Sequence, residues 1–355
     1  MRFVHIADVH LGAIPDGNKP WATERARELW DTFAEVIDVC NEKKADLLLI
    51  AGNLFHRQPL KRELKEVNAL FEKLERTRVV LMAGDRDYLK ETSAYLDFTW
   101  DESVHFFTSA TPEKMYFEDL DCEIWGMSYH TPTITEPLYD SIPLKPRREE
   151  PSDSYRILLA HGGEDEYIPF RPDRLTEKEF DYIALGHLPQ PQLRDRYRMA
   201  YAGSLEPISE NEPGEHGYII GEITEEGTTF ELIPISQRQY ITVQVPVVRE
   251  STTESLVEAV KKIIAEQGEQ NLYTLNMVGR FNPQKPIAVD ELEKTGNIVR
   301  INDKTQAYYD ILKIAHEHDG DLVGEYLEAL HKLPPSPLTN KALYYGLSAL
   351  LADQE

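Results

Sequence analysis

Cysteine is scarce in this sequence, with only Cys40 and Cys122 among 355 residues. Two thiols are too few for a disulfide framework or a metal cage made of thiolates. The sequence also lacks a run of about 18 apolar residues, the length that a membrane-spanning helix requires. Its first six residues lead directly into an expected strand rather than into a signal peptide. We therefore expect a cytoplasmic protein that does not enter a membrane.

Positive charge is also in short supply. Lysine and arginine number 38 against 62 aspartates and glutamates, which gives a formal net charge of -24. Such a surplus of negative charge opposes diffuse attraction to nucleic acid. Any contact with DNA must therefore come from a local group of basic side chains.

The first 238 residues alternate short apolar runs with amphipathic stretches, which predicts an α/β domain built on buried strands. Helices are expected over residues 23–41 and 61–76. A change of pattern near residue 239 predicts a small α/β capping module over residues 239–304, and residues 305–355 read as a helical C-terminal segment. The strands expected in the first domain are residues 3–7, 46–51, 79–83, 104–107, 122–127, 156–160, 182–185, 199–202, 218–223 and 229–233.

Polar residues follow five of these apolar runs, most of them beside glycine. In open α/β sheets, ligand sites gather at the carboxyl ends of strands, where loops converge. A mixture of carboxylate, amide and imidazole groups suits manganese, iron or zinc better than magnesium alone. Each motif is weak by itself, because a lone histidine at a strand end is more often structural, so the weight lies in their order. The five are Asp8-Val9-His10, Gly52-Asn53-Leu54-Phe55-His56, Gly84-Asp85-Arg86-Asp87, His161-Gly162-Gly163 and Gly186-His187-Leu188-Pro189.

This succession resembles the calcineurin-like metallophosphoesterases, and the flanking residues resemble the SbcD-type DNA repair exonucleases. The similar phrases are residues 5–12, 46–55, 184–187 and 201–207. The resemblance implies a four-layer α/β/β/α sandwich with two bound divalent metal ions, Mn²⁺ above all. It also implies DNA as the substrate, a homodimer, and an SbcC-like ATPase as the partner.

The resemblance carries the metal ligands over position by position. One ion of the family is held by the aspartate and histidine of the first motif, here Asp8 and His10, and by a later histidine that Pro189 replaces. The other ion takes residues that correspond to Asp85, His161 and His187, with Asp85 standing where the family has asparagine. The aspartate that bridges both ions in the family corresponds to Asn53.

These departures weaken the first ion position more than the second. Pro189 offers no side-chain ligand, and the neutral amide of Asn53 cannot compensate the charge of two adjacent cations. Asp85 restores a carboxylate at the second position. We therefore expect Asn53, Asp85, His161 and His187 to hold a single ion, while Asp8 and His10 form an impaired site.

Arg86 stands where the family has its catalytic histidine. A guanidinium can bind phosphate through two hydrogen bonds, but with a pKa above about 12 it cannot shuttle a proton. The alternative is a surface ion pair with Asp85 or Asp87. His56 is a second candidate phosphate contact, or simply a polar loop residue.

Three functions remain open at this point. The first is a metal-dependent phosphodiesterase related to SbcD-type exonucleases, with weakened or absent nuclease activity. The second is a non-catalytic paralogue that binds DNA, phosphate or a protein partner. The third is a general phosphomonoesterase, which shares the motifs but not the flanking phrases.

Overall fold

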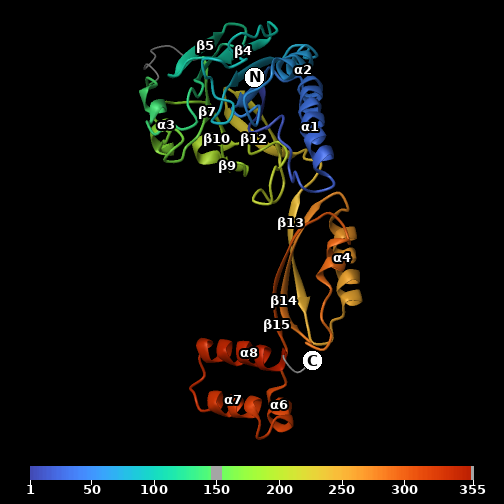
Figure 1. The fold of residues 1–355 in the computed structure, drawn as a ribbon. Helices are drawn as coiled ribbons and strands as arrows, with labels where there is room; N and C mark the ends of the chain where they lie inside the picture. The colour runs from blue at the N-terminus through green and yellow to red at the C-terminus, as the bar shows by residue number, and fades with distance from the viewer. Residues whose placement is uncertain (145–153, 353–355) are drawn as a thin grey trace. The chain divides into compact units, whose positions relative to one another are not determined.

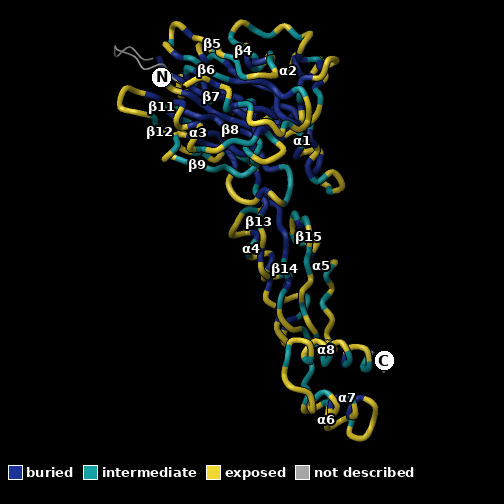
Figure 2. The backbone as a smooth tube through the Cα atoms, turned by 90° about the vertical axis from the view of Figure 1, so that its left-hand side faces the viewer, coloured by how far each residue is buried: buried dark blue, intermediate teal, exposed yellow. Residues whose placement is uncertain are grey.

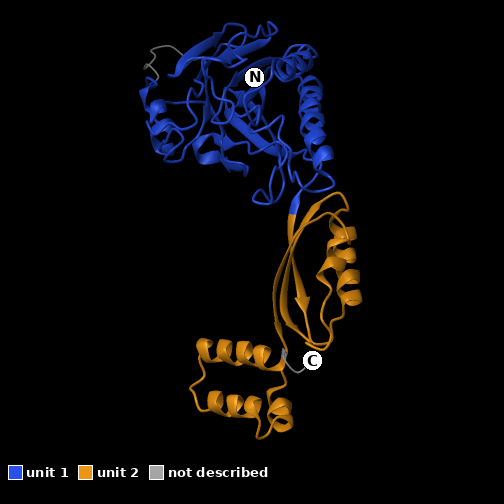
Figure 3. Cartoon of the chain, viewed as in Figure 1, with its two compact units in different colours: residues 1–240 blue, residues 241–355 orange. Residues whose placement is uncertain are grey.

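The computed structural model describes residues 1–144 and 154–352, which form two compact units, residues 1–240 and 241–355 (Figure 3). Each unit has its own hydrophobic core. The expected boundary between the capping module and the helical segment falls within the second unit.

Two six-stranded sheets form the first unit (Figure 1). The first sheet has the order β12-β11-β1-β2-β3-β4, and β1, β2, β3 and β4 run parallel. Its strands are β1 (Arg2–Ile6), β2 (Leu47–Ala51), β3 (Arg78–Met82), β4 (Val104–Phe107), β11 (Gly217–Thr224) and β12 (Gly227–Pro234). The second sheet has the order β5-β6-β7-β8-β10-β9. Its strands are β5 (Glu113–Phe117), β6 (Cys122–Gly126), β7 (Tyr155–His161), β8 (Tyr182–Gly186), β9 (Gln192–Arg194) and β10 (Met199–Tyr201).

Successive side chains of a strand point to opposite faces of its sheet, so they pack in different layers. Leu48 and Ile50 of β2 pack with the helices α1 (Ala22–Lys43) and α2 (Lys61–Phe71), whereas Leu47 and Leu49 face the other sheet. On the far side, the second sheet packs against α3 (Pro172–Thr176) and the 3-10 turn η1 (Leu138–Ser141); a second 3-10 turn, η2 (Asp195–Tyr197), precedes β10. Strands buried on both faces explain the continuous apolar runs, and Figure 2 shows β7 and β8 as buried. The predicted four-layer α/β/β/α fold is confirmed.

The structure differs from the expected elements mainly at sheet edges and helix ends. Strands β5 and β9 were not expected, because both lie at sheet edges and carry charged residues. Helix α2 ends at Phe71 rather than near residue 76. The side chain of Asn41 accepts a hydrogen bond from the backbone N–H of Glu75 and donates one to the carbonyl of Lys73, so it holds this segment in a non-helical turn.

The second unit contains a three-stranded sheet of order β13-β14-β15 and a group of helices. The sheet elements are β13 (Tyr240–Val247), α4 (Thr253–Gln267), β14 (Leu272–Phe281), α5 (Val289–Glu293) and β15 (Ile298–Ala307), with β14 and β15 parallel. The helices α6 (Ile311–Glu317), α7 (Leu322–His331) and α8 (Pro337–Ala352) follow. Among the described residues, none of the helices has the length and apolar character needed to span a membrane.

Candidate metal centre

The carboxyl ends of β1, β2, β3, β7 and β8 carry all the polar motifs, and the two sheets bring these ends together. Backbone hydrogen bonds join the first two loops, from Asp8 N to Gly52 O at 3.1 Å and from His10 N to Asn53 O at 3.1 Å. Nδ1 of His161 in the second sheet lies 2.8 Å from the carbonyl oxygen of Ala51 in the first. This contact ties the sheets together at the site.

The loops adopt left-handed backbone conformations at several site residues. Asp8, His10, Asn53 and His187 have φ values of 49°, 54°, 52° and 94°. Such conformations cost free energy and gather at functional sites, where the surrounding structure holds them. Gly52 also has a positive φ of 84°, and a Cβ atom there would lie only 2.4 Å from His161 Nδ1. The position of His161 therefore requires glycine at residue 52.

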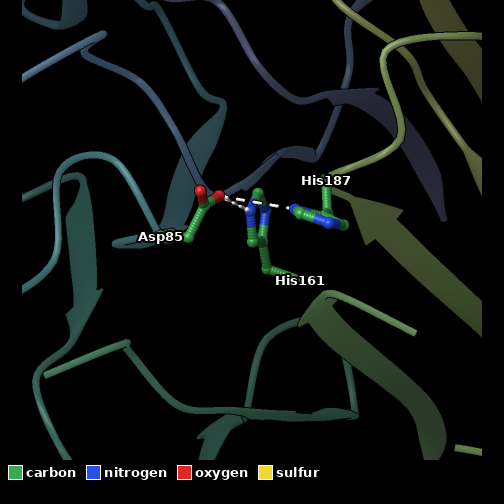
Figure 4. A group of neighbouring side chains, drawn as sticks. All are labelled: Asp85, His161 and His187. Atoms are coloured by element: carbon green, nitrogen blue, oxygen red, sulfur yellow. Dashed lines mark hydrogen bonds and ion pairs between the residues drawn. The ribbon is translucent and has the colours of Figure 1, made fainter. Parts of the chain in front are cut away.

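Asp85, His161 and His187 converge on one point (Figure 4). Oδ1 of Asp85 lies 2.9 Å from Nε2 of His161 and 3.4 Å from Nδ1 of His187. These three potential ligand atoms all lie within 4.8 Å of one another. Asp85 and His161 are buried and His187 is partly exposed, which leaves the cluster open on one side.

Hydrogen bonds fix the orientation of His161. Because a carbonyl only accepts, Nδ1 carries a proton and donates it to Ala51 O, so Nε2 faces Asp85. Burial alone lowers the pKa of His161, but the hydrogen bond to Asp85 and the charges of Asp8 and Asp85 raise it to about 9. Burial likewise raises the pKa of Asp85, yet the hydrogen bonds from His161 and His187 hold it well below its usual value. Without a metal ion, protonated His161 and ionised Asp85 therefore form an ion pair.

Asn53 lies between two carboxylates and donates to both. Its Nδ2 is 2.9 Å from Asp8 Oδ1 and 2.9 Å from Asp85 Oδ1. Its Oδ1 accepts from the backbone N–H of Arg86 at 2.9 Å, which fixes the amide orientation because that N–H can only donate. The sequence-based expectation had Asn53 as a metal ligand; in this structure its Oδ1 is engaged by Arg86 N and its Nδ2 by the two carboxylates.

Asp8 and His10 lie on the other side of Asn53. Oδ1 of Asp8 is 3.9 Å from His10 Nε2, and Oδ2 accepts from the backbone N–H of His187 at 2.8 Å. The rings of His10 and His56 pack edge to face at 5.2 Å, and the Nδ1 atoms of both are buried without a hydrogen-bond partner among the described residues. Pro189 contributes only its carbonyl, which accepts from Ser204 N.

Arg86 is mostly exposed, with its Nε 3.6 Å from Asp85 Oδ2 and 59% of its side-chain surface accessible. The ion pair with Asp85 that we considered from the sequence is therefore present. The pair is long and solvated, so Arg86 can turn toward an anion at little cost.

Sequence reasoning missed several residues that complete the cluster. Oε2 of Glu164 lies 3.3 Å from Nε2 of His187, and the ring of Tyr167 lies 4.1 Å from the His187 ring. The hydroxyls of Tyr129 and Tyr139 both donate to the carbonyl of His161 at 3.1 Å. Of these residues, only Glu164 could have been suggested by the sequence, since it directly follows the His161-Gly162-Gly163 motif.

The residues present fit one divalent ion and not a bridged pair. One carboxylate and two imidazoles with an open side form a donor set suited to manganese, iron or zinc. A second ion next to the first needs an anionic bridge, but Asn53 presents N–H groups to both carboxylates. The amide thus presents hydrogen-bond donors, and no negative charge, between Asp8 and Asp85.

Comparisons with known proteins identify the family of this chain. The family model for calcineurin-like phosphoesterases matches residues 1–199. An uncharacterized metallophosphoesterase, YhaO of Bacillus subtilis, is 28% identical over 251 residues, which are 65% of this chain and 59% of that protein.

Two archaeal relatives carry the name DNA double-strand break repair protein Mre11. The protein of Methanocaldococcus jannaschii is 27% identical over 248 residues, covering 66% of this chain and 63% of the relative. That of Sulfurisphaera tokodaii is 26% identical over 320 residues, covering 83% and 78%. This chain thus spans less than two thirds of the length of YhaO and of the Methanocaldococcus protein. Because the family model matches more than half of the sequence, this chain belongs to the calcineurin-like phosphoesterase family.

Proposed function

We propose that this chain is an SbcD-type member of the family that binds the phosphodiester backbone of DNA at a one-ion centre and has weak or no nuclease activity. The position of Asn53 carries the proposal. Its amide donates to Asp8 and Asp85 at 2.9 Å each, so the two carboxylates are satisfied without a shared pair of cations.

The proposed ion is Mn²⁺, held by Asp85, His161 and His187. A bound divalent ion supplies charge to polarise a phosphoryl oxygen and to lower the pKa of a coordinated water. The protein's own part is to fix His161 through Ala51 O and to present Arg86 at the open side. Arg86 can hold a phosphate oxygen but cannot give a proton to the leaving group, so binding survives better than turnover.

Relatives named for double-strand break repair support DNA as the ligand. The SbcD resemblance adds an SbcC-like ATPase partner and a homodimer to the proposal. The phosphate-binding role without turnover, the second function open from the sequence, gains support from the exposed Arg86 beside a pre-formed ligand cluster.

The test compares the wild type with a variant restored to the family pattern, Asn53→Asp with Asp85→Asn, Arg86→His and Pro189→His. Both are incubated with an end-labelled DNA duplex in excess Mn²⁺. We expect the wild type to be at least about 100-fold slower, since a positioned general acid contributes about that much or more. His161→Ala added to the restored variant is the control for metal-dependent cleavage.

Metal stoichiometry decides the question independently of whether the restored variant folds. Mn²⁺ titration with electron paramagnetic resonance should show one isolated ion per wild-type chain. A coupled pair of ions about 3.5 to 4 Å apart, the separation of two-metal sites, would contradict the proposal. So would wild-type turnover equal to that of the restored variant and abolished by His161→Ala.

A further inference from the structure

The second unit contains a groove whose residues are distant in sequence from those of the metal centre. The carboxyl ends of the parallel strands β14 and β15 form one wall, where Arg280 is opposite Gln306 in the register. Helix α8 forms the other wall and, within this unit, lies beside the end of β15 (Figure 1). The groove encloses about 740 Å³, within the range of about 300 to 1,000 Å³ typical of ligand pockets.

Tyrosine rings line this groove. Tyr309 and Tyr344 stack with ring centroids 6.3 Å apart and an interplanar angle of 29°. The guanidinium of Arg280 lies 4.9 Å above the Tyr344 ring. Tyr345, next along α8, is 75% exposed. Tyr309, Tyr344 and Tyr345 thus place three aromatic rings along one groove, and the Tyr345 ring is open to water.

The charge of the groove is opposite to that of the chain. Arg280, Lys304 and Lys341 line it, and no aspartate or glutamate is among its described lining residues. These three cations form no ion pair with any carboxylate in the described part of the chain, although acidic residues outnumber basic ones 62 to 38. The nearby Asp303 directs Oδ1 to Thr305 N and Oγ1, and Asp310 caps α6, so their hydrogen bonds are made locally.

We infer that this groove binds unpaired nucleic acid, with a base stacked on the open ring of Tyr345 and phosphates held by Arg280, Lys304 and Lys341. Base stacking on aromatic rings beside cationic side chains is the mode by which proteins bind single strands without reading sequence. A duplex hides the faces of its bases, so it cannot use Tyr345. An acidic peptide would use the three cations but gains nothing from the open ring.

This inference is independent of the proposed function, because none of the groove residues contributes to the metal cluster. With a chelator present the ion of the proposed centre is removed, and the part of single-strand binding that is lost on changing Tyr345 reports on the groove. Loss of nuclease activity, or of metal binding, leaves this measurement unaffected.

The experiment uses fluorescence anisotropy of a labelled oligothymidylate of about 15 nucleotides, the upper range of single-strand sites, with the full chain and excess chelator at low salt. Tyr345→Ala should weaken binding about 5- to 150-fold, the value of one stacked base, while Tyr345→Phe keeps the ring and the affinity. Lys304→Ala and Lys341→Ala should each reduce the salt dependence by about 0.7 in the logarithmic slope.

Lys262→Ala is the matched control, since Lys262 lies on α4 of the same unit and its side chain is 78% exposed. It removes the same charge and should leave binding unchanged. The inference is overturned if oligothymidylate does not bind, or if Tyr345→Ala and Tyr345→Phe behave alike. It is also overturned if a matched duplex or polyglutamate binds the groove as tightly as the single strand.

Discussion

The two halves of the metal centre are built from the same kind of element but differ in what faces the carboxylate. On one side, Asp85 meets two imidazole nitrogens at 2.9 and 3.4 Å, a set of atoms that can close around a cation. On the other side, Asp8 accepts from the amide of Asn53 and from the backbone of His187. Asp8 is therefore satisfied by hydrogen bonds, whereas Asp85 retains ligand geometry. In the proposed one-ion centre, the Asn53 amide therefore satisfies Asp8 where the family binds its other ion.

Of the variants considered, Asn53→Asp should change the difference between the two halves of the centre most. The substitution removes two hydrogen bonds to carboxylates and adds a third negative charge, so we expect the metal-free protein to lose about 3 kcal/mol or more of folding stability. The corresponding fall in melting temperature, about 10 °C, is measurable by calorimetry in the presence of a chelator. Excess Mn²⁺ should restore the stability, because the new carboxylate can bridge two ions.

Asn53→Gly is the matched control for that variant, since glycine tolerates the φ of 52° at this position and adds no charge. It should lose stability and gain no more from excess Mn²⁺ than the wild type gains, because it adds no carboxylate for a second ion. A metal-free Asn53→Asp protein as stable as the wild type would show that the amide does not hold the two carboxylates.

His161→Ala and His10→Ala separate the two halves by metal affinity. Loss of the His161 ligand should weaken Mn²⁺ binding by at least about 100-fold, the upper effect of losing a residue that only supports a ligand. His10→Ala should leave the affinity close to that of the wild type, because His10 Nε2 is 3.9 Å from Asp8 and outside the cluster of Asp85, His161 and His187. Isothermal titration calorimetry measures both. Equal losses in the two variants would mean that the ion is shared between the halves.

Gly52→Ala tests whether the half formed by Asp85, His161 and His187 depends on its backbone. The new Cβ would lie 2.4 Å from His161 Nδ1, so His161 must move away from Ala51 O and Asp85. We expect a loss of about 1 to 3 kcal/mol of stability together with weaker Mn²⁺ binding. Gly227→Ala is matched, since Gly227 also has a positive φ, 133°, but a Cβ there meets nothing within 4 Å. It should cost stability alone, and an equal effect of both variants on Mn²⁺ affinity would contradict the role of Gly52.

The sequence predicted the strands that carry the centre because strands buried on both faces leave continuous apolar runs, as in β2 and β8. It also placed Asp85, His161 and His187 at strand ends, and the packing of the two sheets brings those ends together. The role of Asn53 could not be predicted from the sequence, since the orientation of its amide depends on the backbone N–H of Arg86, 33 residues away. The aromatic groove was hidden for the same reason, because Arg280 and Tyr344 meet only through tertiary structure.

Of the variants expected to change Mn²⁺ binding, Arg86→Ala should have the smallest effect. Arg86 places a positive charge 3.6 Å from the Asp85 carboxylate, so its removal should tighten Mn²⁺ binding. The effect should be only about two- to fivefold, because solvated ion pairs are worth up to about 1 kcal/mol. The same variant should bind a phosphate ester less well, since no guanidinium then faces the open side of the cluster. Arg62→Ala removes an equal charge from the exposed face of α2 and should change neither affinity. If Arg86→Ala also leaves both unchanged, Arg86 is only a surface residue and phosphate binding must depend on the ion alone.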